Sequence, residues 1–242
     1  MCCGPSEVSH FKEIIISNNQ FFDAITTRQS ELETLLCVGL DPDPARFPPA
    51  VRKDKEPIFT FNKAMIDATS DLACCYKPQF AFYAANAAEQ ELEKTIAYVR
   101  DLGIPLILDA KRGDVGSTAE NYATEAFERY GADAVTINPY MGLDAMQPFL
   151  AYAEKGIFVL CRTSNPGGAD IQNLVMENGE QLYERVAGLA TQNWNSNNNV
   201  ALVVGATQPG ELARVREITG DMTFLLPGIG AQGGDIEASI KA

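Results

Sequence analysis

The sequence predicts an α/β fold in which parallel strands form a TIM-type (β/α)8 barrel with its eighth strand missing. Three observations predict it: seven short apolar runs recur along the 242 residues, segments of helical period separate them, and polar residues follow nearly every run. Runs that are apolar throughout are typical of parallel strands buried on both faces. An open doubly wound sheet would spread the polar residues along one edge, whereas a closed barrel brings them to one mouth. The chemistry of these residues favours the barrel.

The apolar runs give the expected strands in chain order. They cover residues 35–40, 73–76, 105–108, 134–137, 157–161, 200–204 and 223–226. The expected helices between and after them cover residues 58–72, 90–100, 118–130, 143–152, 179–194, 209–219 and 235–241. In the first of these helices, spacings of three and four residues place Ile58, Phe61, Met65, Ala68 and Leu72 on one face. Strand and helix therefore alternate along the chain.

The N-terminal segment, residues 1–30, holds one more amphipathic stretch. Ser9 is its expected N-cap, and its apolar face comprises Phe11, Ile14, Ile15 and Phe22. We interpret it as a helix that closes the bottom of the barrel. No repeat or linker stands out, so residues 1–242 are expected to form a single domain. The chain stops at Ala242 after a helix, where an eighth strand would come next, so we expect the sequence either to be cut short or to belong to a longer product.

Composition excludes several classes of function. Lys and Arg number 19 against 32 Asp and Glu, a net charge of −13, which argues against a nucleic-acid or anionic-membrane partner. The six cysteines form no C-x-x-C pair and His10 is the only histidine, so no metal site is expected. No stretch is apolar for the roughly 18 residues that a membrane span needs, and no signal peptide is recognisable. We therefore expect a cytoplasmic protein with reduced thiols.

The densest polar cluster follows the third apolar run. It contains Asp109, Lys111 and Asp114 within six residues. Alternate strand residues share a face, so Asp109 and Lys111 are expected to point the same way, with Asp114 in the loop beyond. A lysine between two aspartates stays protonated and serves as a proton donor rather than an amine nucleophile. A surface ion-pair cluster is the alternative, but a position at a strand end favours a functional role.

Two further charged groups and a glycine-rich segment lie at other strand ends. Asp41 follows the first apolar run and Lys77 the second. Residues 226–235 open a helix with several glycines, an arrangement that suits a phosphate group. The sequence has no Rossmann or Walker A motif, and a lone histidine near the N-terminus cannot build a Ser/His/Asp triad. Of the classes of activity considered, the sequence leaves cofactor-free chemistry on a small phosphorylated molecule.

These residues resemble a known family, orotidine 5′-monophosphate decarboxylase. The spacing of Asp109, Lys111, Asp114 and Thr118 looks like that family's signature, and the resemblance extends in order over about residues 20–240. The segments that carry it are 37–43 (CVGLDPD), 76–80 (YKPQF), 108–119 (LDAKRGDVGSTA), 162–168 (RTSNPGG), 204–207 (VGAT) and 227–235 (PGIGAQGGD). They look most like the longer-loop branch of the family.

The resemblance implies a homodimeric barrel that converts orotidine 5′-monophosphate to uridine 5′-monophosphate and carbon dioxide without metal or cofactor. Lys111 would protonate the carbon-6 carbanion, and Asp109 would lie beside the substrate carboxylate and hold Lys111. Asp114 and Thr118 would reach into the partner's site. The substrate-binding positions it implies are Asp41 and Lys77 for the ribose, Thr163 or Ser164 for the pyrimidine edge, and Pro227 and Gln232 in the loop that closes over pyrimidine and phosphate.

Alternatives remain open at this point. A related sugar-phosphate lyase shares the same Asp and Lys core but would need magnesium and another acidic ligand. A nucleotide-binding protein without catalysis is a second alternative. The family's phosphate-binding arginine lies at the end of the eighth strand, which this chain lacks. Fusion to orotate phosphoribosyltransferase is also expected in some members, and a C-terminal organelle address would be lost with the missing segment.

Overall fold

The computed structural model describes residues 19–229 and 235–241. Within these ranges seven strands are present: β1 (Cys37–Leu40), β2 (Cys75–Pro78), β3 (Ile107–Arg112), β4 (Ala134–Ile137), β5 (Gly156–Arg162), β6 (Val200–Val204) and β7 (Phe224–Leu225). The helices are α1 (Gln20–Leu32), α2 (Pro57–Thr69), α3 (Phe80–Ala84), α4 (Glu89–Asp101), α5 (Gly116–Thr124), α6 (Leu143–Leu150), α7 (Ala169–Gln172), α8 (Leu182–Gln192), α9 (Pro209–Thr219) and α10 (Ile236–Lys241). Each of the seven apolar runs contributes a strand, as predicted.

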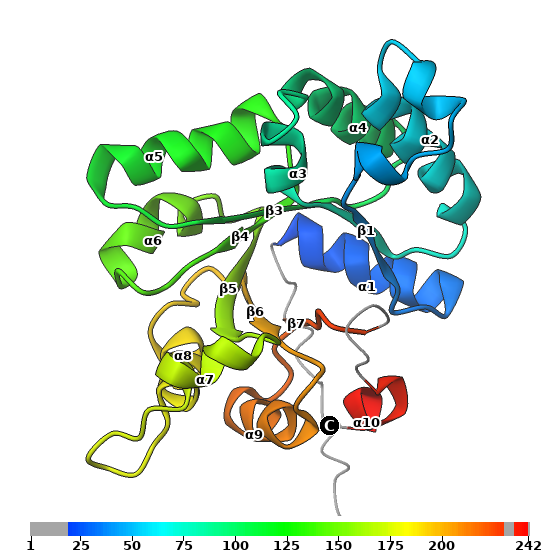
Figure 1. The fold of residues 1–242 in the computed structure, drawn as a ribbon. Coiled ribbons are helices and arrows are strands. Elements are labelled where there is room, and N and C mark those ends of the chain that lie inside the picture. The colour runs from blue at the N-terminus through cyan, green and yellow to red at the C-terminus, as the bar shows by residue number, and fades with distance from the viewer. Residues whose placement is uncertain (1–18, 230–234, 242) are drawn as a thin grey trace, which may run out of the picture.

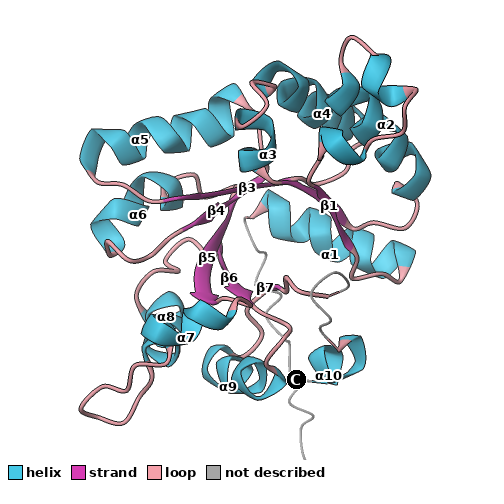
Figure 2. Ribbon diagram, viewed as in Figure 1, coloured by secondary structure: helices cyan, strands magenta, loops and turns pink. Residues whose placement is uncertain are grey.

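All strand pairs are parallel and follow the order of the chain. One sheet joins β1 to β2, and a second runs from β3 to β7. Two isolated parallel bridges, Tyr76 with Leu106 and Gln79 with Asp109, connect β2 to β3. The strands curve into an arc with most helices on its outer side (Figures 1 and 2). This is the predicted barrel, one strand short of eight in the described residues.

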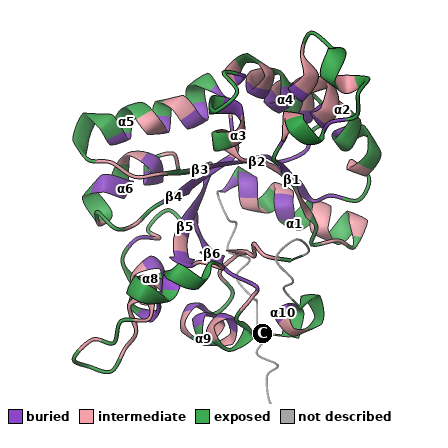
Figure 3. Cartoon of the chain, in the orientation of Figure 1, coloured by how far each residue is buried: buried purple, intermediate pink, exposed green. Residues whose placement is uncertain are grey.

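Burial follows the layers of the fold. The strands from β2 to β6 are mostly buried and β1 and β7 are partly buried, whereas the helices bury the side that meets the sheet (Figure 3). In β4 and β6 every residue is buried. Because such strands have no solvent-facing side, they carry the continuous apolar pattern that marked them in the sequence.

Helix α1 packs against the amino ends of the strands. Its buried residues, Phe21 and Ile25, belong to a cluster with Cys74, Ile107, Ala134, Phe158 and Ala201. The Phe21 ring meets Phe158 edge-on with 5.8 Å between centroids. In the described chain the helix begins at Gln20 behind an Asn19 cap, and Phe22 is only partly buried. The expected cap Ser9 and the apolar residues Phe11, Ile14 and Ile15 lie outside the described residues.

Two expected elements differ from the structure by more than a shift of their ends by a few residues. The third strand does not stop at Leu108 but continues to Arg112 after a shift in its register with β4. The expected helix at 118–130 is α-helical only to Thr124 and then widens into a π-helical turn, Glu125–Arg129. The structure also adds short helices that the periodicity did not indicate, among them α3 and α7, because four or five residues are too few to show a period.

Candidate active site

The carboxyl ends of β1, β2 and β3 bring together charged residues that are far apart in the sequence. Asp41 follows β1, Lys77 lies in β2, and Asp109 and Lys111 lie in β3. The two ammonium groups flank one carboxylate: Lys111 Nζ is 2.6 Å from Asp109 Oδ1, and Lys77 Nζ is 3.1 Å from Asp109 Oδ2. Parallel strands that end at the same edge produce this convergence. The predicted grouping of these four residues at neighbouring strand ends is therefore what the structure has.

The Asp109 carboxylate is buried and fully hydrogen-bonded. Besides the two lysines, Thr136 Oγ1 donates to Oδ1 at 2.8 Å and Gln79 Nε2 donates to Oδ2 at 3.2 Å. Burial alone would raise the pKa of Asp109, but the Lys77 and Lys111 cations and these hydrogen bonds more than offset it and hold the pKa below its usual value. Asp109 is thus a fixed anion at neutral pH.

Asp41 and Lys77 complete an alternation of charges around Asp109. Burial would lower the pKa of Lys77, but the Asp109 and Asp41 carboxylates raise it above its usual value. For Asp41, desolvation by surrounding protein and repulsion from Asp109 raise the pKa, against the opposite effect of Lys77 and Lys111. Asp41 nevertheless stays exposed at the mouth of the barrel. It is therefore the carboxylate of this cluster most open to a ligand.

The backbone at Lys111 is unusual. Its φ of 47° lies in the left-handed region that side chains with a Cβ rarely adopt. The register of β3 against β4 shifts between Leu108 and Arg112, so one part of the strand bulges. The Lys111 amide donates to Thr136 Oγ1 at 2.9 Å. The side chains of Asp109 and Lys111 thus meet across a bulge rather than along a regular strand.

Sequence reasoning did not single out Gln79 and Thr136. Gln79 lies two residues after Lys77 at the same strand end, so the period of two could have indicated it. Thr136 is buried inside an otherwise apolar strand. Its only signal in the sequence was a hydroxyl within an apolar run, because a buried hydroxyl needs a hydrogen-bond partner.

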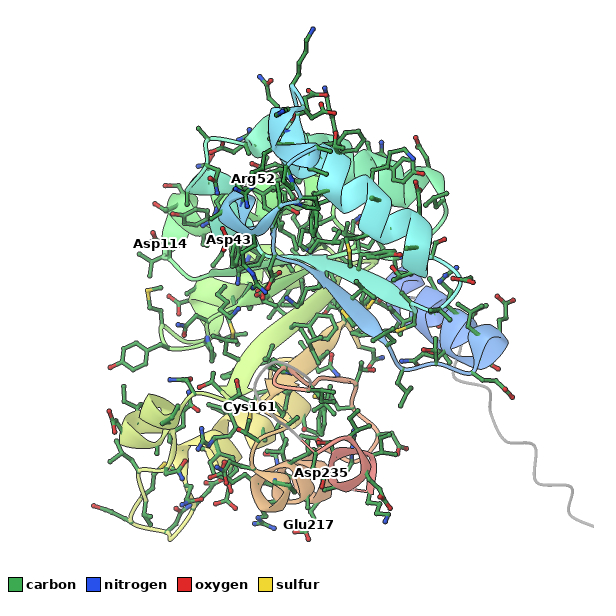
Figure 4. The ribbon with its side chains drawn as sticks, turned by 45° about the vertical axis from the view of Figure 1, so that its right-hand side comes forward. Asp43, Arg52, Asp114, Cys161, Glu217 and Asp235 are labelled. Carbon is green, nitrogen blue, oxygen red and sulfur yellow. The ribbon has the colours of Figure 1, made fainter. Side chains whose placement is uncertain are left out.

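Asp114 and Thr118 follow this cluster in the chain, in the loop after β3 and in α5. Asp114 is in the loop after β3, where its carboxylate accepts a hydrogen bond from the Val115 amide at 2.8 Å, and Figure 4 shows it at the edge of the molecule. Thr118 is exposed in the first turn of α5. In the part of the chain that the structure describes, neither side chain is hydrogen-bonded to Lys111 or Asp109.

The remaining expected site residues lie at the ends of β5 and β7. Ser164 lines an open cavity of about 700 Å³ that includes the buried Arg162 and the hydroxyl-bearing Thr207. The Thr163 hydroxyl is engaged within its own loop, where it donates to Asn165 Oδ1 at 2.6 Å. Pro227 is partly buried after β7, and Gln232 lies outside the described residues.

In the sequence, Arg162 is one residue of a polar segment that follows an apolar run. In the structure it forms an ion pair with Glu211. Its guanidinium Nε lies 2.6 Å from Glu211 Oε2, and both side chains are largely buried. Glu211 is in the first turn of α9, so the pair ties the end of β5 to the helix after β6.

The described residues offer no group of three or more His, Cys, Asp or Glu side chains that could hold a metal ion. Nor is any helix among them both long enough and apolar enough to cross a bilayer.

Comparison with known proteins decides the family. Residues 34–240 match the model of a family described as Orotidine 5′-phosphate decarboxylase / HUMPS. The chain belongs to this family. The family match confirms the decarboxylase resemblance and supports the barrel class. The description of the family names a second group, HUMPS, beside the decarboxylases. Relatives with higher sequence identity therefore indicate which of the two groups this chain resembles.

Those relatives are decarboxylases. The chain is 59% identical to the orotidine 5′-phosphate decarboxylase of Dechloromonas aromatica (strain RCB) over 224 residues, which cover 92% of this chain and 83% of that protein. Among solved structures it resembles the OMP decarboxylase of Leishmania donovani, with a TM-score of 0.81, 44% identity, and coverage of 92% of this chain and 83% of that one. It also resembles the UMP synthase of Leishmania donovani, with a TM-score of 0.84 and 46% identity. That match covers 93% of this chain and 48% of the synthase, so the chain spans about half its length.

Proposed function

We propose that this chain decarboxylates orotidine 5′-monophosphate to uridine 5′-monophosphate and carbon dioxide, with Lys111 as the proton donor. The observation that carries the proposal is the 2.6 Å contact between Lys111 Nζ and Asp109 Oδ1 at the carboxyl end of β3. Loss of carbon dioxide leaves an electron pair on carbon 6 of the pyrimidine. A fixed ammonium there stabilises the developing charge and then gives up a proton to form the new C–H bond.

Asp109 holds Lys111 in place and, in this proposal, lies beside the carboxylate of the substrate. Its lowered pKa keeps it ionised, so bringing a second carboxylate close costs free energy. Binding contacts to the ribose and phosphate, remote from the bond that breaks, can supply that free energy. Truncated substrates without phosphate should therefore lose kcat as well as affinity.

Asp41 and Lys77 are assigned to the ribose hydroxyls, and the pyrimidine edge to Ser164. The exposure of Asp41 supports the first assignment. Two observations favour Ser164 over Thr163 as the contact to the pyrimidine. The Thr163 hydroxyl is hydrogen-bonded to Asn165, and Ser164 lines the cavity after β5. Pro227 and Gln232 are assigned to the loop that closes over pyrimidine and phosphate.

We also propose a homodimer in which Asp114 and Thr118 contribute to the partner's site. Thr118 is exposed and Asp114 partly buried, and among the described residues neither side chain is hydrogen-bonded to Lys111 of its own chain. Large apolar side chains are exposed beside them, among them Val115 at 53% and Tyr140 at 81%, with Met141 and Leu143 next to Tyr140. Gly113 approaches Asn138 closely, so the two loops that carry these residues form one surface.

Decarboxylation is tested by following the loss of orotidine 5′-monophosphate absorbance in the presence of a chelator, with protein expressed from its full-length gene. We expect chelator-resistant turnover that falls by many orders of magnitude in Lys111→Ala, while that variant still binds uridine 5′-monophosphate. Turnover that required added magnesium would instead indicate the sugar-phosphate lyase. A wild-type protein that binds nucleotide without turnover would indicate a binding protein.

The shared site is tested by mixing two inactive variants, Lys111→Ala and Asp114→Asn. In a hybrid dimer, one site combines Lys111 of one chain with Asp114 of the other and is wild type. Mixing after subunit exchange should therefore restore part of the activity. Mixed samples that stay inactive, although the hybrid dimer is present, would contradict a site built from two chains.

Fusion to orotate phosphoribosyltransferase and a cytoplasmic location complete the proposal. The match to less than half of the UMP synthase chain supports the fusion. The described cysteines, Cys37, Cys74, Cys75 and Cys161, are all free thiols, which suits a reducing compartment. The size of the natural product on an immunoblot and its distribution on cell fractionation test these two points.

A further inference from the structure

The strained backbone at Lys111 requires neighbours that hold it. A left-handed conformation at a residue with a side chain costs free energy and persists only where the surroundings enforce it. On one side, Thr136 Oγ1 accepts the hydrogen bond of the Lys111 amide at 2.9 Å. On the other side, the Asn138 amide donates to the Arg112 carbonyl at 2.7 Å. The Lys111 side chain itself is 44% exposed, so besides the contact with Asp109 its position depends on the backbone that carries it.

The residue that follows, Arg112, is held from three directions. Its guanidinium lies between the rings of Phe80 and Tyr122, 4.4 Å and 4.6 Å from their centroids. Its Nε and Nη2 both donate to Glu125 Oε2, at 3.0 Å and 2.8 Å. The rings come from α3 and α5, and Glu125 begins the π-helical turn. A planar cation stacked on two rings and bound to a carboxylate has little freedom left.

These contacts place the Arg112 guanidinium away from the Asp109 carboxylate and its two lysines. Its guanidinium packs among α3, α5 and the π-helical turn, whereas Asp109 faces Lys77 and Lys111 at the strand ends. Its charge is matched by Glu125, so it adds little field at the reacting atoms. An effect of Arg112 on the reaction must therefore act through the position of its neighbour in the chain.

We propose that Arg112 is a positioning residue for the decarboxylation. By fixing the strand immediately after the bulge to α3 and α5, it holds the Lys111 backbone in its left-handed conformation and keeps the ammonium beside Asp109. This inference rests on the proposed role of Lys111 as proton donor. The same anchor fixes the start of the loop that leads to Asp114.

The test compares Arg112→Met with wild type in the absorbance assay, together with the affinity and stoichiometry of uridine 5′-monophosphate binding. A proton donor displaced by about 1 Å costs on the order of 100-fold in rate, so kcat should fall by about that factor. KM and product binding should change little, because Arg112 touches no ligand. Glu125→Gln should lower kcat in the same direction but less, since it keeps both rings and one hydrogen-bond acceptor.

Arg129→Met is the matched control. Arg129 also donates to a carboxylate, Glu93, and stacks on a ring, Tyr130, but lies at the far end of the π-helical turn. Its kcat should equal that of wild type. The inference is overturned if kcat of both Arg112→Met and Glu125→Gln is unchanged, or falls only in proportion to the fraction of protein that binds product. An inactive wild type would instead refute the proposed function.

Discussion

Replacement of Asp109 by asparagine tests whether the charged cluster stabilises the fold as well as serving the reaction. The substitution keeps the shape of the side chain but removes the negative charge between Lys77 and Lys111. An amide also offers one acceptor oxygen where the carboxylate offers two. One of the pairs of donors around Asp109, either Lys111 with Thr136 or Lys77 with Gln79, would then face an NH2 group.

The magnitude follows from the burial of the pair. Asp109 is 6% exposed, and the Lys77 side chain is 16% exposed. Removing one partner of a buried ion pair leaves an uncompensated charge and costs about 3–5 kcal/mol. Lys111 is more exposed and regains water, so it adds little. We therefore expect Asp109→Asn to lower the free energy of unfolding by about 3–5 kcal/mol at pH 7.

The pH dependence has a definite sign. The pKa of Asp109 is lower in the folded chain than in the unfolded one, so its contribution to stability is fully present above the unfolded value, near 4. It is lost as the pH falls through the lower folded value. The stability difference between wild type and Asp109→Asn should therefore be largest at neutral pH and shrink below about pH 4.

Urea unfolding followed by circular dichroism at several pH values measures this difference, and Asp133→Asn is the control. Burial raises the pKa of Asp133 against the attraction of Lys155, whose Nζ lies 3.7 Å away. Because its charged form is already disfavoured, a neutral amide should cost much less there. An Asp109→Asn variant as stable as wild type at pH 7, or no more affected than Asp133→Asn, would refute the reasoning.

Three other substitutions test the packing. A Cβ at Gly156 would lie 2.5 Å from the ring of Phe21, so Gly156→Ala should cost about 1–3 kcal/mol of unfolding free energy by displacing α1. Gly188→Ala, in open space within α8, should instead stabilise by about 0.5–1 kcal/mol, and the reverse order in urea unfolding would contradict this account of α1. The buried Tyr83 hydroxyl donates to the Leu40 carbonyl at 3.1 Å, so Tyr83→Phe should lose about 1–3 kcal/mol, and unchanged thermal and urea transitions would show that this bond contributes nothing.

The sequence predicted elements whose pattern is local. Helix α9 covers residues 209–219, as its spacing indicated, because a proline at its first position and a glycine after its last residue mark both ends. Strands such as β4 and β6 were found because burial on both faces gives them an unbroken apolar pattern. Asp109 and Lys111 were expected on one side, and they do meet, although through a bulge rather than regular alternation.

Features that depend on pairing between distant segments were not predictable in this way. Thr136 looked like core within an apolar run, and only the register of β4 beside β3 brings its hydroxyl to Asp109. Arg112 looked like one more charge in a polar cluster, and its partner Glu125 lies a helix away. The positive φ of Lys111 has no signature in a lysine. Each of these requires knowledge of which neighbours tertiary packing supplies.

The two sheets of the barrel wall meet between β2 and β3 through two isolated bridges, and the Lys77–Asp109 ion pair crosses the same boundary. Partial unfolding begins where few backbone bonds hold a structure together. A fluctuation that parts the sheets here separates the ion pair while both sheets and their helices stay intact. In mild denaturant, activity should therefore disappear before the far-ultraviolet circular dichroism changes, because the reaction centre spans this boundary of few backbone bonds.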